Sequence, residues 1–332
     1  RPHKSMMSPP WLQNMCRSRV GFPATFIRRS ILSKAAPAAE TQKAVQLSAL
    51  IPQRLRKLDP IKDDIPLLVI LHGLLGSANN WRSILGKDNA FPGMFSCSVD
   101  LRNHGRSQHR PSMTYPEMCR DVLEFAETLG VKKASLIGHS MGGKVAMSLA
   151  LRYPERVSSL VVVDIAPVAY EATFMHNSIL DAMANMDLDS ISSASQAREI
   201  LSESIPDAQT REFVLTNLQM DSKTKKYTWK VNVEALRYGI SEGDLAKFPV
   251  VPGSVYEGPV LFVKGSKSRY VRKAHYDRIK ALFPNSEVEE IDTGHWPHAE
   301  AADEFLDLLN EWYARPELQG LEEGHAMKEQ GQ

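Results

Sequence analysis

The sequence predicts an α/β fold with a mostly parallel, doubly wound sheet and an inserted helical cap. Three observations support this prediction. Short apolar runs alternate with segments of helical periodicity, a Gly-x-Ser-x-Gly motif stands between one such run and the next helix, and the alternation stops between residues 170 and 249. Strand–helix alternation favours a parallel sheet, because each parallel connection has to cross the sheet, usually through a helix.

Six short segments are expected to form the strands of the sheet. Residues 67–71, Leu-Leu-Val-Ile-Leu, are apolar throughout, as in a strand that is buried on both faces. The other candidate strands are residues 96–99, 134–137, 158–163, 259–263 and 287–291. Residues 45–50 are a weaker candidate for a first strand. Proline and charged residues interrupt residues 51–65, which show no clear second strand.

Helical segments lie between these strands. Residues 114–129 carry apolar side chains along one face, and residues 141–152, 271–283 and 299–312 are similar in kind. Within the insertion, helical patterns cover residues 175–185, 195–204 and 208–217. The insertion also contains methionines that are candidates for lining a pliable apolar pocket, although core packing is the commoner role: Met175, Met183, Met186 and Met220.

Residues 1–44 are expected to be a mitochondrial targeting segment without stable structure. The first 39 residues hold seven lysines and arginines and no acid, interspersed with single hydrophobic residues. A basic tail for nucleic acid or a merely disordered end would look partly similar. Residues 45–169 and 250–315 are then expected to form the core, residues 170–249 the cap, and residues 316–332 a polar tail.

Charge and composition argue against several classes of protein. The formal net charge of +1 hides an asymmetry, since residues 40–332 hold 33 basic and 39 acidic residues. A folded part with this balance lacks the clustered positive charge that nucleic acid requires. No apolar run reaches the ~18 residues of a membrane-spanning helix. Three scattered cysteines fit neither a disulfide framework nor a zinc site, so no metal and no cofactor are expected.

The Gly-x-Ser-x-Gly motif predicts a nucleophile, Ser140. A strand before the motif and a helix after it are the context of a sharp turn that exposes the central serine at positive φ. Gly138 and Gly142 have no Cβ to clash where the chain packs closely. A glycine-rich turn with a chance serine is the alternative. A phosphate loop is disfavoured, because the Gly-x-x-x-x-Gly-Lys-Ser/Thr spacing is absent.

A serine nucleophile needs a base and an acid that orients the base. His295 lies just after the run that ends at Ile291, where the base of such a site is expected, whereas packing or surface roles suit His139, His176, His275 and His298 better. Residues 264–269, after the penultimate strand, contain no carboxylate. Asp164, at the end of the preceding strand, is therefore the predicted acid, with Asp292 and Asp244 as weaker alternatives.

Acyl transfer also needs two N–H donors for the oxyanion. The backbone N–H groups of Met141 and Leu74 are the candidates, the first following the nucleophile and the second lying in the loop after residues 67–71. Side chains next to these motifs are expected to bind substrate, although the first two could only shape their loop: His72, Gly73, His139 and Trp296.

Five motifs together resemble the α/β-hydrolase superfamily. They are His-Gly at 72–73, Asp-Leu-Arg-Asn-His-Gly-Arg-Ser at 100–107, Gly-His-Ser-Met-Gly-Gly at 138–143, Val-Asp-Ile-Ala-Pro at 163–167 and Gly-His-Trp at 294–296. Over residues 67–313, the chain is most similar to the mitochondrial group of alpha/beta hydrolase domain-containing protein 11, with its fungal relatives and bacterial short-chain esterases. The likeness includes Tyr-Thr-Trp-Lys-Val-Asn at 227–232 in the cap but fails at residues 54–58, where a second strand is expected.

The resemblance implies the α/β-hydrolase fold and a triad of Ser140, Asp164 and His295. It further implies a serine hydrolase that acts on a small-molecule carboxylic ester or thioester. Alcohol O-acyltransfer from acetyl-CoA is an alternative, because some fungal relatives resemble ethanol acetyltransferases. Binding to 2-oxoacid dehydrogenase complexes in the mitochondrial matrix is a third. Serine in place of aspartate at the turn argues against epoxide hydrolase and haloalkane dehalogenase chemistry.

Overall fold

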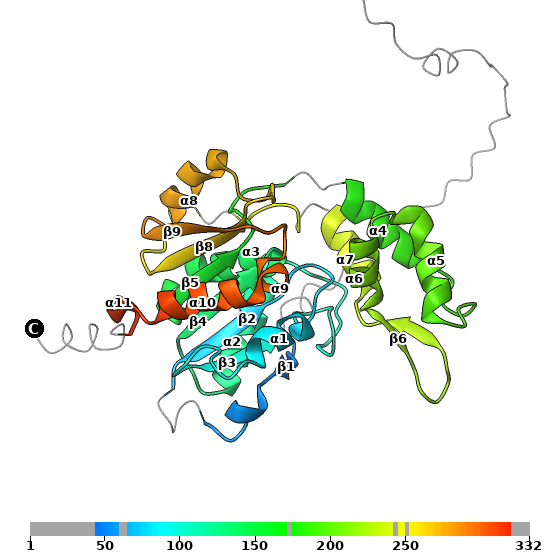
Figure 1. The fold of residues 1–332 in the computed structure, drawn as a ribbon, viewed down its shortest axis with the longest axis horizontal. Coiled ribbons are helices and arrows are strands. Elements are labelled where there is room, and N and C mark those ends of the chain that lie inside the picture. The colour runs from blue at the N-terminus through cyan, green and yellow to red at the C-terminus, as the bar shows by residue number, and fades with distance from the viewer. Residues whose placement is uncertain (1–43, 60–64, 171–173, 242–244, 250–251, 320–332) are drawn as a thin grey trace, which may run out of the picture. The chain divides into compact units, whose positions relative to one another are not determined.

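The computed structural model describes residues 44–59, 65–170, 174–241, 245–249 and 252–319 (Figure 1). Apart from Ala44, the targeting segment expected at residues 1–44 lies outside the described residues. The same holds for residues 320–332 of the expected tail, while its first residues form a short helix, α11 (Pro316–Gln319).

A seven-stranded sheet forms the centre of the described chain, in the order β1-β3-β2-β4-β5-β8-β9. Only the edge pair β1–β3 is antiparallel, and every other pair is parallel. The strands are β1 (Ala49–Leu50), β2 (Leu67–Leu71), β3 (Phe95–Val99), β4 (Ala134–His139), β5 (Val157–Val163), β8 (Val260–Gly265) and β9 (Ser286–Ile291). The six predicted strands are therefore all present, and the α/β prediction is confirmed.

The first edge of the sheet differs from the expectation. Only Ala49–Leu50 of the candidate strand at residues 45–50 pairs with β3. Residues 51–65 showed no clear second strand in the sequence, and their described part contains a short 3-10 helix, η2 (Gln53–Leu55). Proline at position 52 and the charged side chains after it suit such a turn better than a buried strand.

Helices cover both faces of the sheet, as its alternating side chains require. Leu67, Val69 and Leu71 of β2 pack in one cluster with α2 (Tyr115–Thr128) and α3 (Met141–Arg152). Leu68 and Ile70 point the other way, into a second cluster with α1 (Arg82–Leu85) and α10 (Ala302–Tyr313). The remaining helices outside the insertion are α8 (Tyr276–Leu282), α9 (Pro297–Glu300) and the 3-10 helices η3 (Ala78–Trp81), η4 (Pro154–Arg156) and η5 (Lys273–His275).

The insertion lies between β5 and β8 and is mostly helical, as predicted (Figure 1). Its elements are α4 (Phe174–Asn185), α5 (Ala194–Ser204), α6 (Ala208–Leu215), β6 (Leu218–Met220), β7 (Tyr227–Trp229) and α7 (Val233–Ser241). The β6–β7 hairpin and α7 were not predicted. The Trp229 indole N–H donates to the Met183 carbonyl over 3.0 Å, which ties the hairpin to α4.

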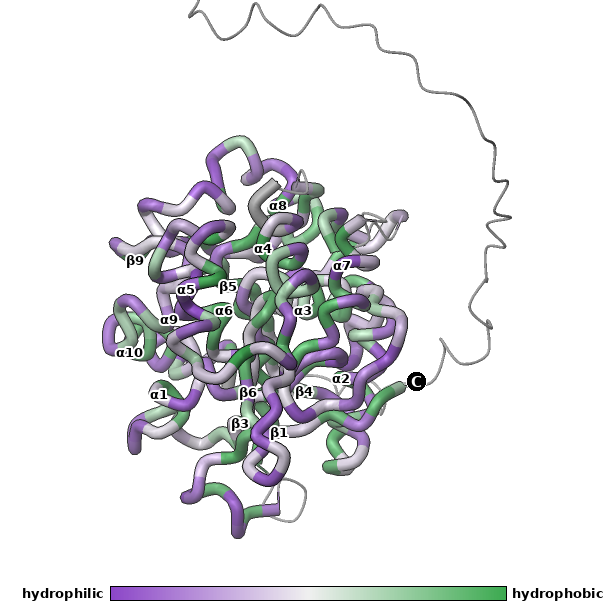
Figure 2. The backbone as a smooth tube through the Cα atoms, turned by 90° about the vertical axis from the view of Figure 1, so that its right-hand side faces the viewer, coloured by the Kyte–Doolittle hydropathy of each residue, from purple (hydrophilic) through white to green (hydrophobic). Residues whose placement is uncertain are grey.

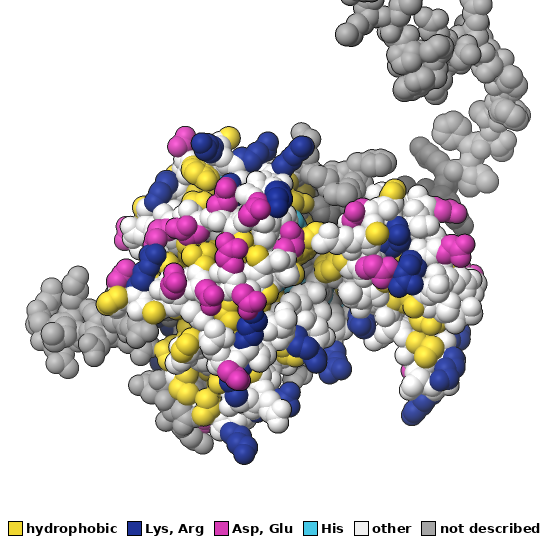
Figure 3. Space-filling view, viewed as in Figure 1, with side chains coloured by type: hydrophobic (Ala, Val, Ile, Leu, Met, Phe, Trp, Pro, Cys, Tyr) yellow, Lys and Arg dark blue, Asp and Glu magenta, His cyan; other side chains and the backbone are white. Residues whose placement is uncertain are grey.

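Figure 2 shows hydrophobic backbone positions concentrated inside the fold and hydrophilic ones toward its outside. On the face shown in Figure 3, acidic side chains gather over α10 and β9. Exposed acids of α10 include Asp303, Glu304, Asp307 and Glu311. This distribution follows from the excess of acids after residue 40, and it offers no stripe of positive charge on that face for nucleic acid.

Candidate active site

Ser140 stands alone between the end of β4 and the start of α3. Its backbone has φ 51° and ψ −117°, a strained conformation for a residue with a Cβ. A Cβ on Gly138 would lie 2.3 Å from the Gly142 carbonyl oxygen, and one on Gly142 would lie 2.5 Å from the Leu71 oxygen. The predicted positive φ and the predicted need for two glycines are thus confirmed.

Asp164 follows β5 directly and is completely buried. Its Oδ2 lies 2.6 Å from His295 Nδ1, and its Oδ1 accepts the Gly265 N–H over 3.2 Å. The Ser268 hydroxyl also donates to Oδ2. A buried carboxylate must have its oxygens satisfied. Here the partners come from β8, from the loop after β8 and from the loop after β9.

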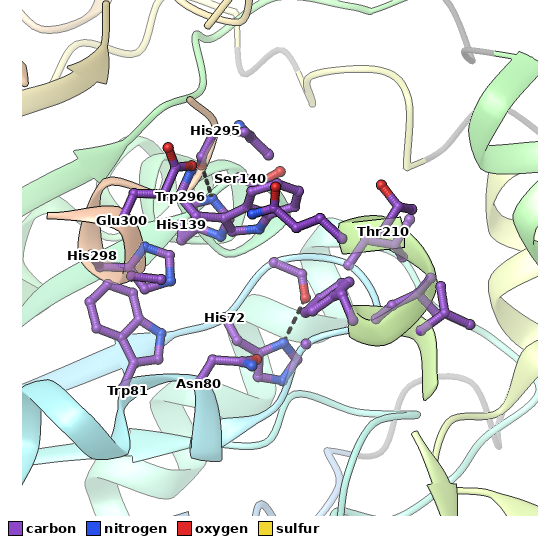
Figure 4. Close-up of a pocket in the computed structure, with 18 of the residues that line it drawn as sticks. His72, Asn80, Trp81, His139, Ser140, Thr210, His295, Trp296, His298 and Glu300 are labelled. Carbon is purple, nitrogen blue, oxygen red and sulfur yellow. Dashed lines mark hydrogen bonds between the residues drawn. The ribbon is translucent and has the colours of Figure 1, made fainter. Parts of the chain in front are cut away.

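His295 lies in the loop between β9 and α9. Glu300 accepts the N–H groups on either side of it, from Gly294 over 2.7 Å and from Trp296 over 3.2 Å. The His295 carbonyl accepts from His139 Nε2 over 2.8 Å, as the dashed line in Figure 4 shows. The Tyr270 ring stacks on the imidazole at 4.1 Å between centroids. The histidine is therefore held at its backbone and on its ring face.

The weaker candidates lie elsewhere. Asp292 is exposed, and hydrogen bonds from Ser266 and Lys267 hold its pKa below the usual range. His298 is buried and stacks on Trp81 at 4.2 Å, and burial lowers its pKa to about 3. Asp244 lies outside the described residues, and the side chain of His176 is not described.

The loop after β2 carries Leu74 and is shaped by two buried histidines. His72 donates from Nδ1 to the Gly73 carbonyl over 2.8 Å and accepts the Leu101 N–H at Nε2 over 3.0 Å. His104 Nε2 accepts the Leu75 N–H over 3.2 Å. Burial lowers the pKa of His72 to about 4 and that of His104 to about 3, so both rings are neutral acceptors at neutral pH.

The two oxyanion candidates flank the serine. Met141 is the first residue of α3, and the first N–H groups of a helix have no acceptor within it. Leu74 lines the same two cavities that Ser140 lines. A Cβ on the neighbouring Gly73 would lie 3.3 Å from Ser140 Cβ, so the loop passes close to the nucleophile. These positions suit N–H donors aimed at a carbonyl bound to Ser140.

Two cavities meet at Ser140. The first, of about 410 Å³, is lined by Ser140 and His295 and by all four predicted substrate residues, His72, Gly73, His139 and Trp296 (Figure 4). The insertion adds Ile179, Gln209, Thr210, Phe213 and Val214 to this wall. The second cavity, of about 800 Å³, also contains Ser140 and extends toward Lys144 on α3.

The insertion's described methionines do not line either of these cavities. Met183 and Met186 pack in the hydrophobic core, and Met220 is 47% exposed. Apolar contacts near Ser140 come instead from Ile179, Phe213 and Val214. Core packing, the commoner role, thus applies to the two buried methionines.

Three contacts of the site were missed by the sequence argument: Ser268, Tyr270 and Glu300. Ser268 lies in residues 264–269, the segment at the end of β8 that contains no carboxylate. A hydroxyl in this segment could have been proposed as a hydrogen-bond donor to Asp164. Glu300 is five residues after His295, a spacing that carries no general signal.

In the described part of the chain, no group of three His, Cys, Asp or Glu side chains could hold a metal ion. None of its helices is long and apolar enough to cross a membrane.

Comparison with known proteins defines the class. Residues 66–302 match the alpha/beta hydrolase fold family, and the chain belongs to this family. It is 38% identical over 253 residues to the sn-1-specific diacylglycerol lipase ABHD11 of Danio rerio, covering 75% of this chain and 78% of that protein. The resemblance to this group is therefore confirmed.

Two further similarities are informative. The probable alcohol acetyltransferase of Saccharomyces cerevisiae is 34% identical over 267 residues, covering 76% of this chain and 78% of that protein. The solved structure of a marine microorganism esterase has 30% sequence identity and a TM-score of 0.71, covering 81% of this chain and 98% of that one.

Proposed function

We propose that the protein is a serine hydrolase that cleaves carboxylic esters or thioesters through an acyl-enzyme on Ser140. The observation that carries the proposal is the 2.6 Å contact between Asp164 and His295, with His295 and the strained Ser140 lining one cavity. The names of the relatives, lipase and esterase, support the same chemistry.

In the proposed reaction, His295 Nε2 takes the proton of the Ser140 hydroxyl as the oxygen attacks the carbonyl carbon. Asp164 accepts a hydrogen bond from the His295 Nδ1–H, which fixes the tautomer and stabilises the imidazolium. The N–H groups of Leu74 and Met141 bind the oxyanion. His295 then gives its proton to the leaving oxygen or sulfur, and water attacks the acyl-enzyme in the same way.

A fluorophosphonate probe tests the nucleophile. It should label the wild type, and the label should vanish in Ser140→Ala. Ser202→Ala is the matched control, because Ser202 is exposed on α5 and its hydroxyl donates to a backbone carbonyl there. Absence of labelling in the wild type would refute the hydrolase and favour a binding role.

Alcohol O-acyltransfer is a second candidate for the same site. It is supported by the name of the Saccharomyces cerevisiae relative, a probable alcohol acetyltransferase, and by the insertion side chains near Ser140. We propose that these side chains act as a cap that excludes water. With acetyl-CoA and ethanol, the ratio of ethyl acetate to acetate separates the two activities. A ratio above one would favour transfer.

We also propose a mitochondrial location, in the matrix, and an association with 2-oxoacid dehydrogenase complexes. The acid-free composition of the first 39 residues supports the location, while the association rests on the sequence resemblance alone. Residues 1–44 fused to a fluorescent protein should enter isolated mitochondria. Replacing the seven lysines and arginines of residues 1–39 by glutamine should prevent import. Co-purification with the complexes from mitochondrial extract tests the association.

A further inference from the structure

The second cavity is built differently from the first. Much of its wall is apolar, with Met141, Ile165 and Val168 from the core and Ile240 and Leu245 from the insertion. Three cations also line it, namely Lys144, Arg269 and Arg272. The described lining contains no aspartate or glutamate. A cavity that is both apolar and cationic suits a ligand with a hydrocarbon body and an anionic group.

Lys144 is the unusual member of this wall, because its side chain is only 3% exposed. Its Nζ donates to the carbonyls of Ala246 over 2.8 Å and Lys247 over 3.2 Å, and lies 4.9 Å from the centroid of the Tyr170 ring. An ammonium has three N–H donors, so these carbonyls leave one available. Among the described residues, no carboxylate forms an ion pair with it.

A buried ammonium without a counter-charge is unfavourable, since desolvation is not repaid by a partner. Burial accordingly lowers the pKa of Lys144 to about 7. An anion in the cavity would supply the missing partner. Arg269 and Arg272 are exposed and lie on the same cavity wall, so they can attract the anion as it enters.

The position of His295 shows which end of a substrate enters this cavity. His295 has to protonate the leaving group, and it lines the first cavity but not the second. The leaving alcohol or thiol therefore belongs in the first cavity, and the acyl group in the second. Lys144 comes one helical turn after Ser140, about 6 Å further along α3, which a short acyl chain can span.

We propose that the second cavity is the acyl-binding site and that it selects acyl groups ending in a carboxylate, which Lys144 binds with the help of Arg269 and Arg272. The inference rests on the proposed hydrolase function and specifies its substrate class, the monoesters and monothioesters of short dicarboxylic acids. Hydrolysis of such an ester would release an alcohol or thiol and the dicarboxylate.

A matched pair of substrates tests the proposal: the p-nitrophenyl monoester of adipic acid and p-nitrophenyl hexanoate, which differ in the terminal carboxylate. The wild type should favour the anionic ester by at least about tenfold in kcat/KM, the effect of one well-placed charged contact. Lys144→Met should abolish this preference and Arg269→Gln should lower it severalfold. Equal use of both esters by the wild type would overturn the proposal.

Two controls separate substrate binding from structural effects. The Tyr115 hydroxyl donates to the Leu245 carbonyl over 2.8 Å and so braces the same part of the insertion as Lys144 does. Tyr115→Phe should change kcat/KM for both esters equally. Lys273→Gln removes an exposed charge next to Arg272 that does not line the cavity, and should keep the preference. If Lys144→Met affected both esters equally, Lys144 would be only a brace.

Further measurements separate the assignment of the cavities from the proposed function. The hexanoyl ester of 4-hydroxybenzoate carries its negative charge on the leaving group. If the enzyme preferred this ester to one with an anionic acyl group, the assignment of the two cavities would be refuted. Calorimetry of Ser140→Ala with the p-nitroanilide of adipic acid monitors binding without turnover. Binding that depends on Lys144 supports the proposal even if no ester is cleaved, and binding indifferent to Lys144→Met overturns it.

Discussion

The nucleophile turn and the histidine loop lie on the same edge of the sheet but are held by different forces. At the turn, backbone packs against backbone, so that a Cβ on Gly138 or Gly142 would approach a carbonyl oxygen to 2.5 Å or less. At the histidine loop, side chains hold the backbone through hydrogen bonds: Glu300 accepts two backbone N–H groups, and His139 donates to one carbonyl.

This difference predicts different responses to substitution. Steric contacts between backbones cannot relax, because the surrounding core is close-packed. Hydrogen bonds from side chains can be weakened one at a time, each with a limited effect on stability but a direct effect on the orientation of His295. The turn should therefore tolerate almost no change, while the loop should lose activity in steps.

The largest effect is expected from Asp164→Asn, which removes the carboxylate that bonds to His295 Nδ1. The asparagine NH2 is a hydrogen-bond donor where the carboxylate accepted the Nδ1–H, so His295 takes the wrong tautomer. In serine proteases, the same change lowers kcat about 10⁴-fold. A similar loss is expected here with little change in the circular dichroism spectrum, measured with a p-nitrophenyl ester.

Asp292→Asn is the control for this change, because Asp292 is exposed and bonded to Ser266 and Lys267. Its activity should stay within about twofold of the wild type. Near-normal activity of Asp164→Asn would instead transfer the role of the acid to Asp292 or Asp244.

Acid should destabilise the fold around the site, because several of its histidines are buried. The unfolded chain has a histidine pKa near 6.5, whereas burial lowers the pKa of His72 to about 4 and those of His104 and His298 to about 3. Burial also holds the pKa of His139 well below its usual range. As the pH falls below about 6.5, the unfolded state binds protons first. The stability contributed by these groups is therefore complete above this pH and is lost on the way to about pH 3.

The expected slope is steep, since four protons correspond to at most about 5 kcal/mol per pH unit. Urea unfolding between pH 7 and pH 4.5 measures it. His298→Phe should reduce the slope by about one quarter, because it removes one of the four groups and retains a ring to stack on Trp81. An unchanged slope in this variant would show that His298 does not titrate in the unfolding transition.

Two glycine-to-alanine changes compare the regions directly. Gly142→Ala would place a Cβ against the carbonyl oxygens of Leu71 and His72, at 2.5 and 2.6 Å, and overpacking of this kind destabilises by about 1–3 kcal/mol. Gly294→Ala would meet only the end of the Glu300 side chain, at 3.0 Å, which can move. Its unfolding free energy should fall by less than about 1 kcal/mol. Equal losses in urea unfolding would contradict the distinction.

The sequence predicts these two regions unequally for the same physical reason. The turn is a local motif, and both glycines and the strained serine can be inferred from five consecutive residues. The histidine loop depends on contacts across the fold. Asp164 was inferred because no acid follows the next strand, but Glu300 and Tyr270 required coordinates, since their roles arise from a helix and a loop that meet only in the folded chain. Strands such as β2 and β8 were predictable from their continuous apolar runs, whereas the short β6–β7 hairpin, half exposed, has no such run.

The smallest effect, and the most specific to the histidine loop, is expected from Glu300→Gln. The glutamine carbonyl can accept one of the two N–H groups beside His295, but its amide nitrogen faces the other N–H with a second donor. The loop should tilt, so that kcat falls about tenfold, or about 1.4 kcal/mol, while KM stays within twofold because substrate binding is not altered. Glu304→Gln on α10, an exposed position outside the cavities, is the matched control and should leave both constants unchanged. A rise in KM with kcat unchanged would indicate that Glu300 contacts substrate in the first cavity, where it also forms part of the wall, and that His139 and Asp164 suffice to position the imidazole.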